Sequence, residues 1–149
     1  MFAVVTDDVM KQDYTPSNMW KGDSIQLGIH YGGILDPSVS LFTEIGLALC
    51  SGVPSIQRYS NESGASGVTK NMKFEGRREG TKTYYEASMP WREIIMDGMN
   101  LKAGDAVRFN MIVNDNDNVD RWGWVEYSSG IGIEKDGTKF GRMNLIDNR

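Results

Sequence analysis

An indole and a polar amide stand six residues apart in the segment Trp20–Gln26, which reads Trp-Lys-Gly-Asp-Ser-Ile-Gln. The alternation that starts at Ser24 predicts a strand, so Trp20 precedes this strand and Gln26 lies on its non-core face. An aromatic plane suits the C–H face of a sugar ring, and an amide can both donate to and accept from hydroxyl groups. The pair therefore indicates a carbohydrate site, while the alternative is that Trp20 packs as a rim residue of the fold.

Two indoles one strand pitch apart offer a second aromatic surface. In the segment 121–127, alternation places Trp122, Trp124 and Glu126 on one strand face, and Arg121, Val125 and Tyr127 on the other. A polysaccharide could stack on the two indoles as on a flat platform. If that face is the core, the same indoles only pack, and the periodicity does not decide between the two.

Oxygen-bearing side chains are concentrated in the run 114–120 and at the end of the first predicted strand. Hard cations such as calcium bind carboxylate and amide oxygens in flexible geometry. The run lacks the Gly and Glu spacing of an EF-hand, and asparagine and aspartate also favour ordinary turns. The candidate calcium ligands are Asp7, Asp8, Asn114, Asp115, Asp117 and Asp120.

The sequence contains few candidate catalytic residues. His30 is the one histidine and Cys50 the one cysteine, so an intrachain disulfide and a Cys-based zinc site are excluded. The sequence has no nucleophile-elbow, phosphate-loop or dinucleotide motif. A carboxylate pair for glycoside hydrolysis depends on a separation in space, so a small polysaccharide-active enzyme stays an alternative.

The charge balance excludes several partners. Sixteen Lys and Arg against twenty Asp and Glu give a net charge of −4, and the pI is near 5.0. Without a basic run, nucleic-acid binding has no electrostatic basis. No apolar stretch approaches the roughly 18 residues that span a bilayer, so we expect no membrane partner, no spanning helix and no signal peptide in this stretch.

Composition and periodicity favour a β-protein. Seventeen Gly, four Trp and six Tyr in 149 residues are untypical of a helical bundle. We expect one domain over residues 1–149, an antiparallel β-sandwich with jelly-roll or immunoglobulin-like layers. One short helical turn is expected at Pro90–Ile95, ended by Gly98, and a long surface loop at Ser51–Gly67. The predicted strands, with half-buried alternation in the second, are Phe2–Thr6, Ser24–Tyr31, Thr43–Cys50, Val68–Phe74, Lys82–Met89, Val107–Asn114, Trp122–Tyr127 and Met143–Ile146.

Five segments resemble, in order, those of family 9 carbohydrate-binding modules, and together they cover nearly the whole chain. They are Phe2–Asp8, Trp20–Leu27, Tyr85–Trp91, Phe109–Asp115 and Lys135–Gly141. The resemblance implies a β-sandwich that binds sugars without cleaving them and holds structural calcium. Such modules are attached to secreted xylanases and other polysaccharide-degrading enzymes, so a secreted, extracellular location within a larger enzyme is implied, with xylan or cellulose as ligand classes.

The resemblance also assigns site residues. It places Trp20 at the stacking indole and Gln26 where a Glu is often found, while Glu44 replaces an Arg that contacts sugar hydroxyls. Glu134 stands where a second indole would complete the stack around the sugar. We therefore expect weak affinity, or a flatter site in which Trp122 and Trp124 serve as the platform.

Two further expectations concern the start of the chain and a rival function. Family domains begin with strands ahead of Phe2, so we expect a missing N-terminal portion and a homodimer formed through the exposed strand edge near Phe2–Thr6. A haem-binding electron-transfer domain of the related DOMON type, with His30 and a Met as iron ligands, is the other alternative.

Overall fold

The computed structural model describes residues 1–31, 42–60, 69–95 and 100–147. Within these ranges the chain forms nine strands and three short 3-10 helices: β1 (Phe2–Thr6), η1 (Pro16–Lys21), β2 (Ser24–His30), β3 (Thr43–Cys50), β4 (Val53–Ser60), β5 (Lys73–Glu79), β6 (Lys82–Ser88), η3 (Trp91–Glu93), β7 (Ala106–Asp115), β8 (Gly123–Glu126), η4 (Gly137–Lys139) and β9 (Gly141–Asn144). Every strand pair is antiparallel. The predicted all-β antiparallel sandwich is confirmed.

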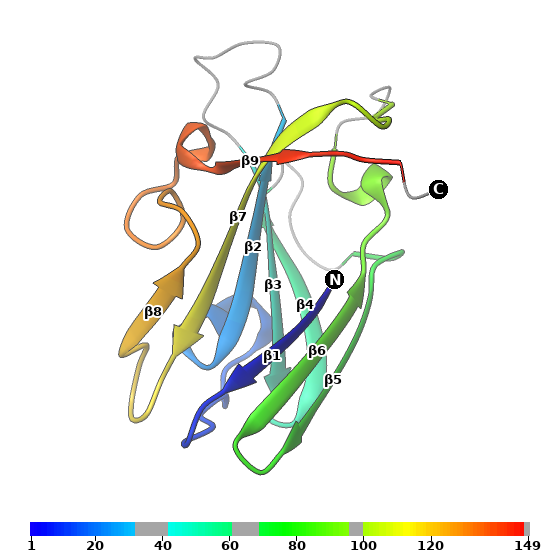
Figure 1. Cartoon of the computed structure of the whole chain (residues 1–149). Helices are drawn as coiled ribbons and strands as arrows, with labels where there is room; N and C mark the ends of the chain where they lie inside the picture. The colour runs from blue at the N-terminus through cyan, green and yellow to red at the C-terminus, as the bar shows by residue number, and fades with distance from the viewer. Residues whose placement is uncertain (32–41, 61–68, 96–99, 148–149) are drawn as a thin grey trace.

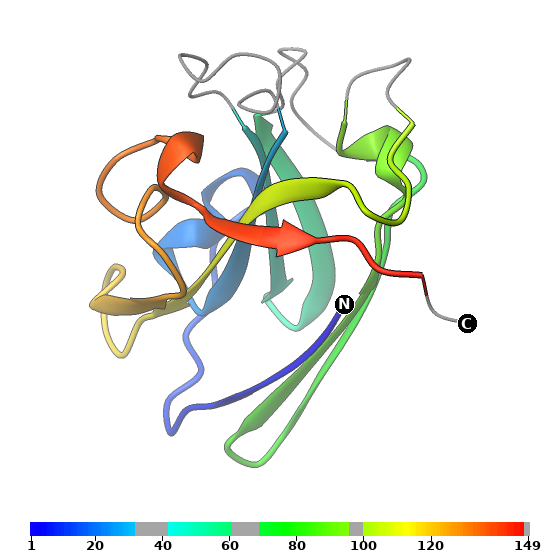
Figure 2. The same ribbon diagram turned by 45° about the horizontal axis from the view of Figure 1, so that its top comes forward.

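The strands form two sheets that face each other (Figure 1). The smaller sheet has the order β1-β6-β5, and the larger has the order β4-β3-β2-β7-β8, with β9 pairing on β7. Contacts between β4 and β5 join the sheets along one side. Figure 2 shows β9 crossing beside β7, with η4 at the end of the larger sheet where the C-terminal segment folds back. The larger sheet therefore contains six of the nine described strands and has one face turned away from its partner.

The main core lies between the sheets. Alternate residues of β2 and β3, Ile25, Leu27, Ile45 and Leu47, pack with Tyr85 and other residues of the smaller sheet. All four aliphatic side chains are at most 2% exposed. Burial of this kind stabilises the fold by about 1.5–3 kcal/mol for each large side chain.

The opposite face of β2 is also buried, so the prediction of a half-buried strand was wrong. Every residue of β2 and β3 is buried. Met19 of η1 covers one part of this face, and Phe140, which follows η4, covers another. Periodicity within β2 cannot reveal this cover, because it comes from segments far away along the chain. The face of β2 and β3 that looked solvent-exposed is an interior surface with polar residues in it.

Two strand predictions were wrong in position, and the strands predicted at Trp122–Tyr127 and Met143–Ile146 are instead β8 (Gly123–Glu126) and β9 (Gly141–Asn144). The expected loop Ser51–Gly67 contains β4, an edge strand whose Pro54 pairs with Leu49 where a missing N–H costs little. The strand expected at Val68–Phe74 begins only at Lys73 and runs to Glu79. Residues 61–68 and Gly98 lie outside the described residues.

The expected helical turn near Pro90 is confirmed as η3, while η1 and η4 were not predicted. Pro16 occupies the first position of η1, where the absent proline N–H leaves no hydrogen bond unmade. Among the described residues, no helix reaches the length and apolar character that a bilayer crossing requires. Two of the short helices cover the larger sheet, since η1 contacts β2, β3 and β4, and η4 contacts β2.

Candidate functional site

A cavity of about 290 Å³ opens on the face of the larger sheet that is turned away from the main core. Two small apolar clusters cover this face, one built on Met19, Ala48 and Cys50 and the other on Ile112, Ile131 and Phe140. Tyr59 packs against the first cluster and Ile131 belongs to the second, and both side chains line the cavity. The residues that line it are Trp20, Gln26, Glu44, Tyr59, Arg121, Ile131, Gly132, Ile133 and Lys135.

A row of hydrogen-bonded polar side chains crosses the sheet beneath this cavity. Asn114 of β7 donates from Nδ2 to Gln26 Oε1 at 2.9 Å, and Gln26 of β2 donates from Nε2 to Glu44 Oε1 on β3. Lys135 Nζ lies 2.7 Å from the same Glu44 oxygen. The amide and the carboxylate are almost fully buried, at 3% and 4% exposure. Their mutual bonds fix both side chains, so their orientation is set before any ligand arrives.

An aromatic and cationic rim borders this polar row. Trp20 lies in η1 and is half-buried. The Arg121 guanidinium lies 4.4 Å from the ring centroid of Trp124 and 5.4 Å from that of Trp20, and it donates to Asn114 Oδ1 at 3.1 Å. Arg121 thereby links two indoles from distant segments. The rim offers an apolar ring with positive charge beside it.

Tyr59 of β4 reaches the cavity because Gly46 leaves room for it. A Cβ on Gly46 would lie 2.8 Å from Tyr59 Cε2 and 2.9 Å from Met19 Sδ. Burial raises the pKa of the Tyr59 phenol above its usual range, and the Glu44 charge adds to that rise. Tyr59 therefore keeps its proton at neutral pH and can act as a hydrogen-bond donor.

The far wall of the cavity is a loop held by Glu126. Its Oε1 accepts from the backbone N–H groups of Ile131 and Gly132 at 2.8 and 3.2 Å, and from Asn110 Nδ2. A Cβ on Gly132 would lie 2.4 Å from Trp124 Nε1, so the loop packs directly on that indole. Glu126 thus positions the wall that carries Ile131 and Ile133.

Three predicted sugar-site residues converge, namely Trp20, Gln26 and Glu44. Trp124 borders the cavity through Gly132 and Arg121, while Trp122 is 80% exposed, lies just before β8 and does not line it. Glu134 pairs with Lys139 at 2.8 Å. Sequence reasoning missed Tyr59, Arg121, Ile131, Ile133 and Lys135.

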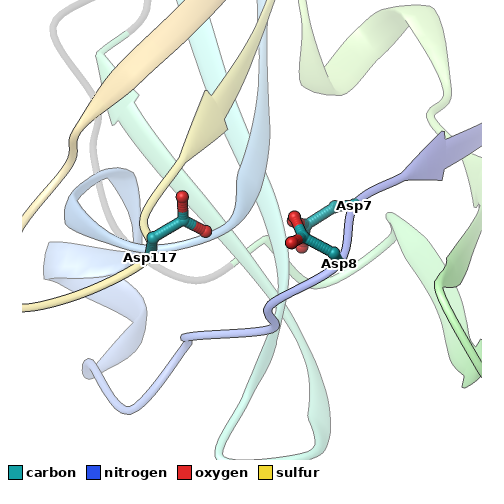
Figure 3. A group of neighbouring side chains, drawn as sticks. All are labelled: Asp7, Asp8 and Asp117. Carbon is teal, nitrogen blue, oxygen red and sulfur yellow. The ribbon is translucent and has the colours of Figure 1, made fainter.

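A group of carboxylates lies apart from this cavity. Oxygens of Asp7, Asp8 and Asp117 lie within 4.8 Å of one another, where the turn after β1 meets the loop after β7 (Figure 3). Burial raises the pKa of Asp115, and the negative charges of these three residues add to the rise.

The other three predicted ligands, Asn114, Asp115 and Asp120, do not belong to this group. Asn114 bonds to Ser24 and Gln26, and Asp120 lies 3.9 Å from Lys21 Nζ. Of the predicted oxygen ligands, three therefore form the carboxylate group, Asn114 belongs to the polar row, and Asp120 pairs with Lys21.

Asp23 gives a pH prediction. Its carboxylate accepts from the backbone N–H groups of Lys11 and Asn116, but burial raises its pKa from 3.8 to about 6, helped by the charges of Asp7 and Asp115. The folded protein then keeps a proton that the unfolded chain has lost, so the stability from this group is present at low pH and falls as pH rises through 6. Between pH 5 and 7 we expect a loss of about 1 kcal/mol.

Urea unfolding in EDTA at several pH values measures this loss. Asp23→Asn, which cannot titrate, should show a flatter pH dependence even if the variant is less stable overall. An unchanged slope in the variant would assign the pH dependence to other groups.

Comparison of the structure with solved structures finds a family 9 carbohydrate-binding module (CBM9) from Caldicellulosiruptor kristjanssonii, in one structure in complex with glucose and in another with cellotriose. Both match with a TM-score of 0.66 and 14% sequence identity, over 99% of this chain and 70% and 69% of the other. No family model and no curated protein matches the sequence. The resemblance noted in the sequence is confirmed at the level of architecture: this chain has a CBM9-like fold.

Proposed function

We propose that this protein is a non-catalytic carbohydrate-binding module whose cavity binds an oligosaccharide or the end of a plant-type polysaccharide such as cellulose or xylan. The observation that carries the proposal is the convergence of Trp20 with the pre-bonded Gln26–Glu44 pair in one cavity. The structures of similar fold, which contain glucose and cellotriose, add support. A sugar ring needs an apolar surface and fixed polar groups together, and this cavity supplies both.

Each part of the cavity has a distinct role in this proposal. The Trp20 ring contacts the C–H face of the sugar, while Gln26, Glu44 and Tyr59 exchange hydrogen bonds with its hydroxyls. The second wall is aliphatic, because Ile131 and Ile133 line the cavity and Glu134 pairs with Lys139. Aliphatic contact is weaker than a second indole stack, so the expected affinity is modest.

Two rival functions have less support. Glu44 is the only carboxylate among the described residues that line the cavity, and Lys135 and Gln26 already engage it. Glycoside hydrolysis needs two carboxyl groups across the bond to be cleaved. For haem binding, His30 is wholly buried, and its ring packs against Gly137. An iron ligand at that ring would require the η4 region to move.

A glycan array followed by calorimetry with cellotriose and xylotriose tests the proposal. We expect saturable binding without reducing-sugar release from xylan or glucan. Release of reducing sugar would support the enzyme instead, and a Soret band after haem addition would support the haem domain. Absence of binding to every glycan would overturn the proposal.

We also propose that the protein works outside the cell as part of a larger secreted hydrolase. The support is physical: cellulose and xylan are too large to enter a cell, so a module that binds them must meet them outside. Joining a binding module to an enzyme raises the local substrate concentration without adding any contact in the active site.

A structural calcium ion is a further proposal, and the carboxylates fit it. Calcium–oxygen distances of about 2.3–2.6 Å allow one ion to bridge oxygens up to roughly 5 Å apart, and those of Asp7, Asp8 and Asp117 meet this limit. The ion would hold the turn after β1 to the loop after β7 and relieve the repulsion between like charges.

Calcium should therefore raise the melting temperature. At about ten times its Kd, calcium that binds only the folded state adds about 1.4 kcal/mol. Melting curves in calcium and in EDTA measure the effect, and Asp117→Asn should reduce it. Asp13→Asn is the matched control, because Asp13 is exposed, pairs with Lys11 and is not one of the three carboxylates. Identical curves with no metal found by elemental analysis would contradict the prediction.

We also propose that the protein self-associates through β1. In the described residues β1 pairs only with β6, and Phe2 and Val4 are 65% and 44% exposed. An edge strand with exposed apolar residues can pair with a second copy. We expect a dimer that dissociates on dilution in light scattering, and Val4→Lys should shift it toward monomer. Val125→Lys on the β8 edge is the control, and a monomer at every concentration would refute the proposal.

A further inference from the structure

The cations around the cavity outnumber the anions. Arg121 and Lys135 line it, and Glu44 is the only acidic residue among the described residues that do so. Lys21 adds a third cation, since its Nζ lies 5.4 Å from the Trp20 ring centroid, the same distance as Arg121. This local excess of positive charge occurs on a chain whose net charge is −4.

Two of these three cations have an ion-pair partner, but Arg121 has none among the described residues. Lys135 neutralises Glu44 at 2.7 Å, and Lys21 lies 3.9 Å from Asp120. Arg121 has no carboxylate within ion-pair distance among the described residues, and its one side-chain hydrogen bond there goes to Asn114 Oδ1. A guanidinium has five N–H donors, so most of them stay available.

The nearest acidic groups do not supply the missing partner. Asp120 accepts from the Arg121 backbone N–H, and Glu126 Oε1 accepts from three donors of its own loop and of β7. Partial burial lowers the pKa of Arg121, while the charges of Asp120 and Glu126 act in the opposite direction. The guanidinium is thus partly desolvated, lies beside two indoles and forms no ion pair with any described residue.

We infer that the cavity prefers saccharides that carry a carboxylate, that is, a uronic acid residue. This inference rests on the proposed carbohydrate-binding function and names its ligand class. The Trp20 ring and the Gln26–Glu44 pair contact the sugar ring, and the guanidinium edge of Arg121 receives the carboxylate. An Arg–carboxylate pair is planar and two-pronged, and its hydrogen bonds are roughly twice as strong as neutral ones.

Calorimetry at pH 7 compares matched ligands on the whole protein: glucose with glucuronate, and xylotriose with the same trisaccharide bearing a glucuronosyl branch. We expect the acidic member of each pair to bind about tenfold more tightly at low salt. The gap should shrink in 1 M NaCl, because salt screens the charge contribution. Acetate alone should bind far more weakly than glucuronate, since it lacks the ring that Trp20 and Gln26 contact.

Variants connect the preference to one side chain. Arg121→Gln should bind neutral and acidic ligands equally. Arg121→Lys should keep part of the preference, because an ammonium group supplies the positive charge but not the two parallel N–H donors of a guanidinium. Arg77→Gln is the matched control: Arg77 stacks on Tyr84 at 4.2 Å on the outer face of the smaller sheet, so its loss should change nothing. If a variant folds poorly, the effect of salt on the affinity gap between acidic and neutral ligands in the wild type still tests the inference.

The outcomes separate two failures. Equal binding of the neutral and acidic members, or acetate binding as strong as that of glucuronate, overturns the carboxylate preference and leaves the proposed function intact. A preference that survives in Arg121→Gln also overturns it. Absence of binding by every sugar overturns the proposed function, and the inference fails with it.

Discussion

Replacing Trp20 with alanine should weaken oligosaccharide binding about thirtyfold, a loss of about 2 kcal/mol. The indole is half-buried in η1, lines the cavity and lies beside the fixed Gln26–Glu44 pair. A bound sugar ring would remove its remaining face from water, and that contact cannot be replaced by a methyl group. Calorimetry on wild type and variant gives the difference directly.

The matched control for this experiment is Trp122→Ala. Trp122 is 80% exposed and does not line the cavity, so its removal should leave affinity unchanged. Gln26→Ala should cost less than Trp20→Ala, because it removes hydrogen bonds and not the stacking surface. If Trp20→Ala stays folded by circular dichroism and binds as wild type does, Trp20 only packs. A loss in Trp122→Ala instead would move the site to the platform on β8.

Replacing Gly28 with alanine should lower the free energy of unfolding by about 3 kcal/mol, the upper end of the usual cost of overpacking. Gly28 lies in the middle of β2, and a Cβ there would lie 2.5 Å from Phe140 Cε2 and 2.9 Å from Ile131 Cδ1. Phe140 is 2% exposed and stacks edge-on against Phe42, so it has little room to move. Urea unfolding measures the loss directly.

The same change should weaken sugar binding, because Ile131 belongs to both the crowded cluster and the cavity wall. Gly123→Ala is the matched control in another strand, since a Cβ there meets nothing within 4 Å. It should leave stability and affinity nearly unchanged. Equal stability of the two alanine variants would show that the C-terminal segment does not pack on β2 as described.

The parts of the fold that sequence predicts well are those whose pattern is local. β1 and β3 keep their predicted bounds, and β2 and β6 each end one residue early. β4 was not predicted because it is an edge strand whose sequence does not alternate between apolar and polar residues, and it is half-exposed along most of its length. β5 was misplaced because Phe74 is the one large apolar residue in a charged strand, so periodicity gives no register.

In the candidate site, too, the residues that are close along the chain could be predicted and the distant ones could not. Trp20 and Gln26 are close along the chain, and their types alone suggested the chemistry. Arg121 and Lys135 could not be found this way, because they reach the cavity from loops more than ninety residues after β2. No periodicity links such residues to a strand face. The available signals were indirect: Arg121 stands directly before the Trp-Gly-Trp segment, and Lys135 begins one of the five segments that resemble the family.

The two buried faces of β2 constrain how this protein can evolve. Its even-numbered residues Gln26 and Gly28 face the cavity side and its odd-numbered residues Ile25, Leu27 and Ile29 face the core. Inserting or deleting one residue would exchange the faces, driving an amide into the core and isoleucines into the ligand cavity. Lineages of this fold should therefore change ligand by point substitution at Gln26 or by remodelling the loops at Arg121 and Ile131–Lys135, while the length of β2 stays fixed.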